Sequence, residues 1–243
     1  MMDDFDRPIS DIVKMDYRTA DVFKKYQLGF CCTGNAALKT ACEARGLDFG
    51  SVSSELKEST KNLMLPNFLP FDEWKIDFLI DYITNVHHTY IYMVIPSLSE
   101  SLKSFTTGHQ DKYPELAEVL KIFTELTGVL MTHNRHEDEI IFPYIKQIDS
   151  ALRRKEPYGN LFVRTLRKPL HIVEQEHLRI QQLLNALQVT TNYFTPPESA
   201  CVNYGVIYKK LEELNNNLTQ HKHLEQDLLF PKAIAIEQKL LQV

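Results

Sequence analysis

Cysteine is scarce in this chain, and a secretion signal is missing. The 243 residues contain four cysteines at irregular spacing: Cys31, Cys32, Cys42 and Cys201. Such a sparse set is unlike the disulfide framework of a small secreted protein. The N-terminus, MMDDFDRPIS, is acidic and lacks the apolar segment of a signal peptide. We therefore expect a cytoplasmic protein whose thiols are reduced.

Other features are also absent, and each absence excludes a class of function. No run of about 18 uncharged apolar residues occurs, so no membrane span is expected. Lysine and arginine number 27 against 32 acidic residues, which argues against a nucleic-acid partner. Neither a glycine-rich nucleotide motif nor a haem-attachment motif is found, so electrons for any redox chemistry would come from a partner protein.

Helical periodicity dominates what is present. Residues 1–62 predict a small helical domain, residues 63–71 contain prolines and predict a linker, and residues 72–243 predict four long helices. These helices are expected at about 72–105, 113–149, 164–188 and 197–237. Because the connections are short, the predicted fold class is all-α, with an antiparallel four-helix bundle after the small helical domain.

Histidines and glutamates continue the apolar faces of three of these helices. The second helix carries His133 and Glu137, the fourth carries His221 and Glu225, and His177 lies on the apolar face of the third. Burying such groups without partners would cost several kcal/mol each. A lone histidine of this kind is usually a hydrogen-bonded core residue. Here His and Glu four apart share one helix face, so both can reach a metal ion at the bundle centre.

A repeat strengthens the metal interpretation. The segments LMTHNRHEDEIIFPYI and NLTQHKHLEQDLLFPKA share the pattern H-x-x-x-E-x-x-[IL]-[IL]-F-P. Two copies on the second and fourth helices predict a pseudo-symmetric site with two metals, bridged by one carboxylate from each copy. On the first helix, one apolar stripe points to His87 and another points to His88, and periodicity slightly favours His87.

At this point the chain resembles the iron-sulfur cluster repair proteins, also called the repair-of-iron-centres family. These are bacterial di-iron proteins with a short N-terminal Cys-Cys domain and a hemerythrin-like bundle. The segment YQLGFCCTGN at residues 26–35 is similar to the family's Y-x-[hydrophobic]-x-[YF]-C-C-x-G. The two repeats, the segment Glu174-Gln175-Glu176-His177, and His87-His88 ahead of Ile95-Pro96 complete the resemblance.

The resemblance implies a ligand set, residue by residue. It selects His88 rather than His87, because the family's first ligand lies eight positions before the proline of its L-P motif, here Pro96. The implied cofactor is a pair of non-haem iron ions with an oxo or hydroxo bridge and two bridging carboxylates, Glu137 and Glu225. The complete implied set is His88, His133, Glu137, His177, His221 and Glu225.

The implied function is repair of iron-sulfur clusters damaged by nitrosative or oxidative stress, through release or donation of iron to the damaged proteins. Oxygen-carrying hemerythrins place two histidines four apart on the third helix, whereas Val173 and Gln181 flank His177 at that spacing here. The third helix therefore supplies one metal ligand fewer, which leaves a coordination position for an exogenous ligand such as nitric oxide or oxygen. Two alternatives are a sensor or scavenger of these gases, and an oxidoreductase that reduces nitric oxide or peroxide. A homodimer is left open.

Cys31 and Cys32 are interpreted as accessory redox or iron-handling thiols. Placement near a helix N-terminus would make these thiols more reactive. The alternative is two small buried residues in a tight turn, and only the family match favours a functional role. Cys42 and Cys201 are expected to be structural. Glu176 either orients a metal ligand or faces solvent, and two histidines lie off the apolar faces: His136 and His223.

Overall fold

The computed structural model describes residues 7–31, 34–62, 69–156 and 159–242, apart from the side chains of residues 162 and 165–171. Every regular element in these ranges is a helix, which confirms the all-α prediction. The chain divides into two compact units, residues 1–67 with 194–212, and residues 68–193 with 213–243. The sequence-based boundaries at 62 and 72 stay a prediction, and most of the predicted linker lies outside the described residues. No helix in the described ranges is long and apolar enough to cross a membrane.

Short helices form the N-terminal unit around a core that includes Phe23, Leu38 and the fully buried Cys42. Gly34 follows the Cys-Cys pair, and a Cβ there would lie 2.7 Å from the Phe30 carbonyl carbon, so the turn requires glycine. The unit also includes the first part of α10 (Val202–His223). Its other helices are α1 (Ile9–Met15), α2 (Thr19–Lys25), α3 (Leu38–Ala44) and α4 (Phe49–Ser59).

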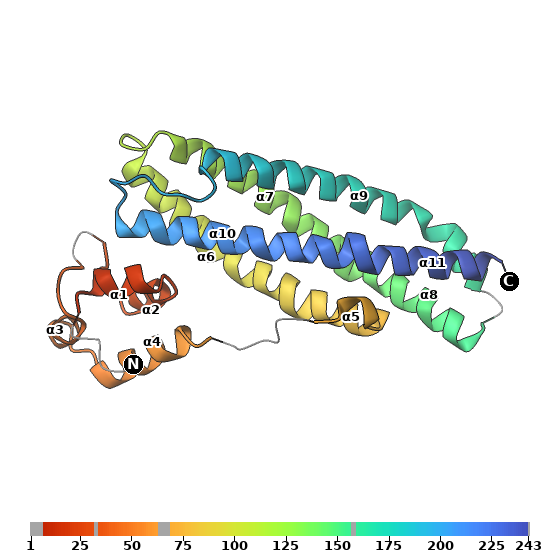
Figure 1. Cartoon of the computed structure of the whole chain (residues 1–243), viewed down its shortest axis with the longest axis horizontal. Coiled ribbons are helices and arrows are strands. Elements are labelled where there is room, and N and C mark those ends of the chain that lie inside the picture. The colour runs from red at the N-terminus through yellow and green to blue at the C-terminus, as the bar shows by residue number, and fades with distance from the viewer. Residues whose placement is uncertain (1–6, 32–33, 63–68, 157–158, 243) are drawn as a thin grey trace. The chain divides into compact units, whose positions relative to one another are not determined.

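Four helical columns form the second unit, and Figure 1 shows that successive columns run in opposite directions. This confirms the antiparallel bundle. The columns are, in order: the 3-10 turn η2 (Phe71–Glu73), α5 (Ile76–Tyr82), η3 (Ile83–His88) and α6 (Thr89–His109); α7 (Glu115–His136), η4 (Glu137–Ile141) and α8 (Phe142–Arg154); α9 (Gly159–Thr190); and the second part of α10, η5 (Leu224–Leu229) and α11 (Phe230–Leu241).

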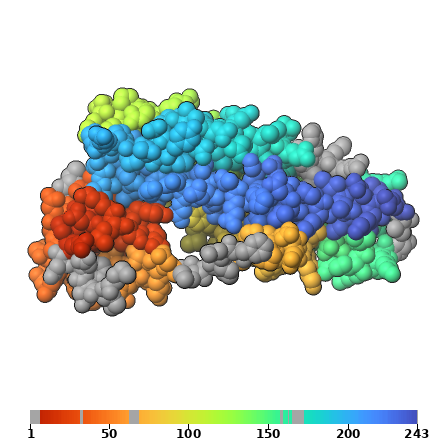
Figure 2. Space-filling view, in the orientation of Figure 1, coloured from red at the N-terminus to blue at the C-terminus, as the bar shows by residue number. Residues whose placement is uncertain are grey.

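Some helix ends differ from the prediction. The fourth long helix of the prediction begins with α10 at Val202 rather than near Pro197, because Pro196 and Pro197 lie in an irregular segment before it. The third column begins earlier than expected, at Gly159. Figure 2 shows coloured side chains of α9, α10 and α11 along one face of the bundle. The interior below this face holds a continuous apolar core that includes Ile83, Ile145 and Leu229.

Three of the columns contain a π-helical turn, η3, η4 or η5. A π-turn accommodates an extra residue and therefore shifts the register of the buried face. Phe142-Pro143 and Phe230-Pro231 follow η4 and η5 directly and open α8 and α11. Proline lacks the N–H that a continuous α-helix would use, so it fits immediately after the wider turn. The F-P of the sequence repeat therefore marks the end of a π-turn.

Candidate metal centre

The six residues implied as ligands meet in the interior of the bundle. Their side chains come from all four columns, and none is more than 3% exposed. Three of them lie in π-turns: His88 ends η3, Glu137 begins η4, and Glu225 is in η5. Such π-turns are frequent at functional sites, and here they bring the three side chains into one buried layer.

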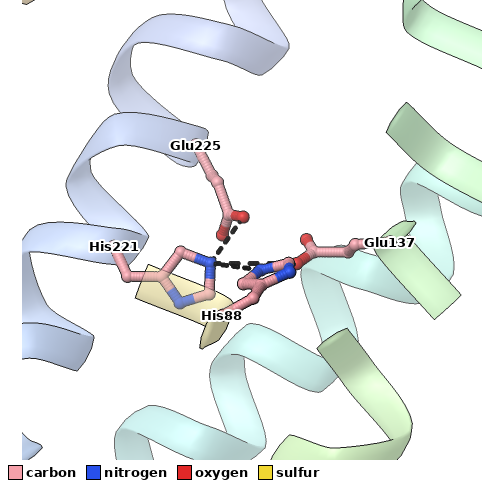
Figure 3. Close-up of side chains that lie close together, drawn as sticks. All are labelled: His88, Glu137, His221 and Glu225. Atoms are coloured by element: carbon pink, nitrogen blue, oxygen red, sulfur yellow. Dashed lines mark hydrogen bonds and ion pairs between the residues drawn. The ribbon is translucent and has the colours of Figure 1, made fainter. Parts of the chain in front are cut away.

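The side chains form two groups of four that share both carboxylates. In one group the ligand atoms of His88, Glu137, His221 and Glu225 all lie within 4.8 Å of one another. The second group, with the same limit, combines the two glutamates with His133 and His177. Figure 3 shows the first group, with His221 and Glu225 pointing from one helix toward His88 and Glu137. Each group could hold a metal ion, and the two groups have both carboxylates in common.

The distances between ligand atoms are short in both groups. The Nε2 atoms of His88 and His221 are 3.0 Å apart, and those of His133 and His177 are 3.1 Å apart. Two nitrogens bound to one ion at about 2.1 Å, with an angle of about 90° between them, would lie about 3 Å apart. The paired imidazoles therefore have the spacing that one cation per pair requires.

The two glutamates supply a further test of fit. Both Glu137 and Glu225 are 0% exposed. Neither oxygen of Glu137 has a hydrogen-bond partner, and Oε2 of Glu225 has none either. In the protein alone, ion pairs with imidazoles 3.2–3.4 Å away offset the cost of burying these carboxylates, and a metal cation would take over that role when the imidazoles are neutral. Imidazole and carboxylate donors in this proportion suit iron, zinc or manganese, so the residues present fit a metal pair.

A surrounding layer of polar residues fixes the imidazole rings. Nδ1 of His88 lies 2.8 Å from Oδ1 of Asp138, and Nδ1 of His133 lies 2.9 Å from Oε2 of Glu176. The amide of Gln226 lies 3.0 Å from Nδ1 of His177. The two carboxylates accept from Nδ1 of His88 and His133, which orients these rings and would leave each Nε2 free for a metal, whereas the amide nitrogen of Gln226 donates to Nδ1 of His177.

Sequence reasoning found only part of this layer. Glu176 was expected to orient a ligand or face solvent, and its carboxylate contacts His133 on another column. Asp138 and Gln226 were missed. They occupy the same position in the two repeats, directly after Glu137 and Glu225. Their matching position in the two repeats could have identified them as residues next to the site.

With no metal bound, ion pairs among the clustered residues shift the pKa values of their histidines and glutamates. Burial disfavours the charged form of His88, but Asp138 and Glu137 outweigh it and raise the pKa of His88 to about 9. Burial likewise opposes protonation of His133, yet Glu137 and Glu176 raise its pKa to about 9. The pKa of Glu225 is held well below its ordinary value, because neighbouring histidines overcome the effect of burial.

His87 is buried but lies outside both metal groups. Its ring stacks on the ring of His221, with centroids 5.7 Å apart and an interplanar angle of 10°. Burial, followed by the nearby His221, lowers its pKa to about 4. Both rings of the His87-His88 pair are interior because they share the π-turn η3. The periodicity that favoured His87 therefore identified a buried residue, but His88 is the one that joins the cluster.

The remaining candidate residues lie outside the two groups of clustered side chains. Cys31 is half-buried in the turn before α3, which begins only at Leu38, while Cys32 lies outside the described residues. His136 lies 3.8 Å from Glu176 at the edge of the centre. His223 is exposed and pairs with Asp227. Val173 and Gln181 flank His177 on α9, and neither belongs to a metal group.

Comparison with known proteins agrees with this geometry. The chain is 28% identical over 236 residues to the iron-sulfur cluster repair protein YtfE of Enterobacter sp. (strain 638), covering 96% of this chain and 98% of that protein. It is also 28% identical over 234 residues to the protein of the same name from Escherichia coli O81 (strain ED1a), with coverage of 96% and 98%. These matches confirm the resemblance drawn from the Cys-Cys segment and the repeats.

Two family models match the chain. Residues 5–60 match a domain of unknown function, DUF542. Residues 79–233, well over half of the chain, match the hemerythrin HHE cation binding domain. All six clustered histidines and glutamates lie inside the second match. The chain therefore belongs to the hemerythrin HHE cation-binding family.

Proposed function

We propose that this protein repairs iron-sulfur clusters damaged by nitrosative or oxidative stress, by giving up iron from a di-iron centre. One observation carries the proposal: two buried groups of imidazoles share the same pair of carboxylates. The printed name of the relatives, which match over nearly the whole chain, supports the same function. The partners would be damaged iron-sulfur proteins, encountered in the cytoplasm.

In this proposal the cofactor is a pair of non-haem irons. His88 and His221 would hold one ion, and His133 and His177 would hold the other. Glu137 and Glu225 would bridge them, with an oxo or hydroxo group as a further bridge. Each ion would then have two imidazole and two carboxylate ligands, which leaves coordination positions for small ligands and would keep the iron exchangeable.

The protein's own groups prepare this centre. Asp138 and Glu176 hold the Nδ1 protons of His88 and His133, which directs both Nε2 atoms inward. The apolar core around the layer limits access of water, and the low local dielectric strengthens the carboxylate–cation attraction. The relatives' name does not favour the two alternative functions, gas sensing and reduction of nitric oxide or peroxide.

The first experiment measures metal content and repair together. Anaerobically purified wild-type protein should contain about two irons per chain by elemental analysis. It should also restore the activity of an iron-sulfur enzyme whose cluster was damaged by nitric oxide. Glu137→Gln and Glu225→Gln should lower both the iron content and repair. His109→Ala is the matched control, because His109 contacts Phe105 and is not part of the cluster. Full iron loading without any repair would refute the proposed function while leaving the di-iron site intact.

The same assay tests the proposed role of the Cys-Cys pair. If Cys31 and Cys32 handle iron or electrons, the Cys31→Ala, Cys32→Ala variant should keep its iron and repair clusters more slowly. Cys42→Ala is a poor control because Cys42 is in the core, so Cys201→Ala serves instead. Wild-type repair by the double variant would remove the accessory role from the proposal.

A further inference from the structure

The N-terminal unit contains a cavity of about 370 Å³. This volume is in the range of small-molecule binding sites, toward its lower end. All of the described lining residues belong to residues 1–67 or 194–212, the two segments that make up this unit. The clustered histidines and glutamates all belong to the other unit. The cavity is therefore a different site from the metal centre.

The walls of the cavity are mostly apolar. Val13 lies on α1 and Val206 on α10, and these side chains are only 1% and 2% exposed. The segment between α9 and α10 adds the buried Phe194 together with Pro196. A wall of this kind with a small number of polar groups is typical of a site for a small organic molecule.

Gly205 lines the same cavity from the first turn of α10. Inside a helix, glycine is less favourable than alanine because it loses more conformational freedom on folding. Close packing does not require glycine here, because no atom outside its own helix lies within 4 Å of the position that a Cβ would occupy. Gly205 therefore leaves space open at a cost to helix stability.

Two lysines are the only charged side chains among the described residues that line the cavity, Lys14 and Lys209. Lys14 pairs with Asp11 at 2.9 Å, and Lys209 pairs with Glu212 at 2.7 Å. Both lysines are exposed, and such surface pairs are weak. Neither carboxylate lines the cavity. The ammonium groups can therefore turn toward an acidic group at the solvent edge of an apolar space.

We propose that this cavity binds a small organic acid. The apolar body of the acid lies against the valine and proline side chains, and its carboxylate or sulfonate pairs with Lys14 or Lys209. Burial of the apolar body favours binding, and the charged contact selects an acid over a neutral molecule of the same shape. The inference does not rest on the di-iron function, because none of the residues that carry it belongs to the metal centre.

Two fluorescent dyes with the same aromatic skeleton separate charge from shape. Anilinonaphthalene sulfonate carries one sulfonate, and phenylnaphthylamine is its uncharged counterpart. Both should bind the folded, full-length protein, and the sulfonate should bind about five-fold more tightly. Lys14→Met combined with Lys209→Met should abolish this preference and leave the affinity for the neutral dye within about two-fold. Lys121→Met is the matched control, since Lys121 forms the same kind of exposed pair, with Glu118 at 3.3 Å, outside the cavity.

Gly205→Phe tests the location, because the added ring would occupy the open space. It should weaken the binding of both dyes by about ten-fold. Gly128→Phe is the matched control: Gly128 lies within α7, and a Cβ there also has no atom outside its own helix within 4 Å. In the wild type, either dye should slow the alkylation of Cys201 by iodoacetamide and leave Cys31 unaffected, as measured by mass spectrometry.

Three results would overturn the inference. Absence of dye binding to the wild type, or binding that does not protect Cys201, would remove the site. Equal affinities for the two dyes would refute the assignment to acids. If Gly205→Phe does not fold, the protection of Cys201 in the wild type decides the location. Because the dyes are tested on protein with and without iron, failure of the di-iron proposal leaves this test unaffected.

Discussion

Asp138 is outside the ligand set, yet it is coupled to it directly. Its carboxylate contacts Nδ1 of His88 at 2.8 Å and also accepts from the Tyr92 hydroxyl at 3.1 Å. The His88 contact keeps the pKa of Asp138 below its ordinary value against the opposing effect of burial. Both partners are therefore charged in the protein alone, and the ring of His88 is held in one orientation.

Replacing this carboxylate should weaken the metal centre. Asp138→Ala is expected to lower metal affinity by about ten- to a hundred-fold, since the ligand ring loses its orienting partner. The measurement is a competition titration against a chelator of known affinity. Asp227→Ala is the control, because Asp227 makes the same kind of contact to the exposed His223 at 2.7 Å. Equal effects of the two substitutions would argue against an orienting role.

The two helices that follow the F-P motifs, α8 and α11, are joined by a buried polar contact. Tyr144 donates to Oε1 of Glu237 at 2.6 Å, and these residues are only 3% and 2% exposed. A buried acceptor that loses its donor bears the full cost of its desolvation. The contact therefore stabilises the packing of α8 on α11, the helices that continue two of the ligand-bearing columns.

We expect Tyr144→Phe to lower the free energy of unfolding by about 1–3 kcal/mol, because Glu237 is left without this donor. Urea denaturation of the metal-free protein measures the change. Adding Glu237→Met should recover much of the loss, since both polar partners are then removed. Tyr26→Phe removes a comparable contact to the more exposed Glu55 and should have a much smaller effect. A harmless Tyr144→Phe would mean that water satisfies Glu237.

Protonation, metal binding and folding are linked in the molecule as a whole. In the protein alone, His88 and His133 each have a pKa of about 9, above the ordinary value of 6.5. Their ion pairs therefore stabilise the metal-free fold fully below about pH 6.5, and this contribution is lost as pH rises through about 9. Metal binding requires the neutral imidazoles and so has the opposite dependence.

Zinc affinity should consequently rise between pH 7 and pH 9. One proton is displaced at each metal position, from His88 at one and from His133 at the other, so the affinity for each ion should rise by up to about ten-fold per pH unit. Competition titrations at pH 7, 8 and 9, corrected for the protonation of the chelator, measure it. Asp138→Ala should flatten the dependence by removing one cause of the raised pKa of His88. An affinity independent of pH in the wild type would contradict the assigned protonation.

Periodicity in the sequence by itself determined the helical bundle and five of the six clustered residues, and the family resemblance added the sixth, His88. His133 with Glu137, and His221 with Glu225, are four apart, so the geometry of a single helix places each pair on one face. His177 interrupts an apolar face, which is also a local signal. These features depend on short-range periodicity, and the repeat makes them visible without any knowledge of packing.

Only the tertiary structure decided the rest. Periodicity favoured His87 over His88, and only the structure gives the physical reason why His88 joins the cluster: the π-turn η3 shifts the register where periodicity assumes a regular helix. Asp138 reaches His88, and Lys222 reaches Gln181, across columns far apart in the chain. The sequence pattern of one helix cannot predict these contacts, because they form only when the columns pack together. Packing buries the polar groups, and buried polar groups are hydrogen-bonded.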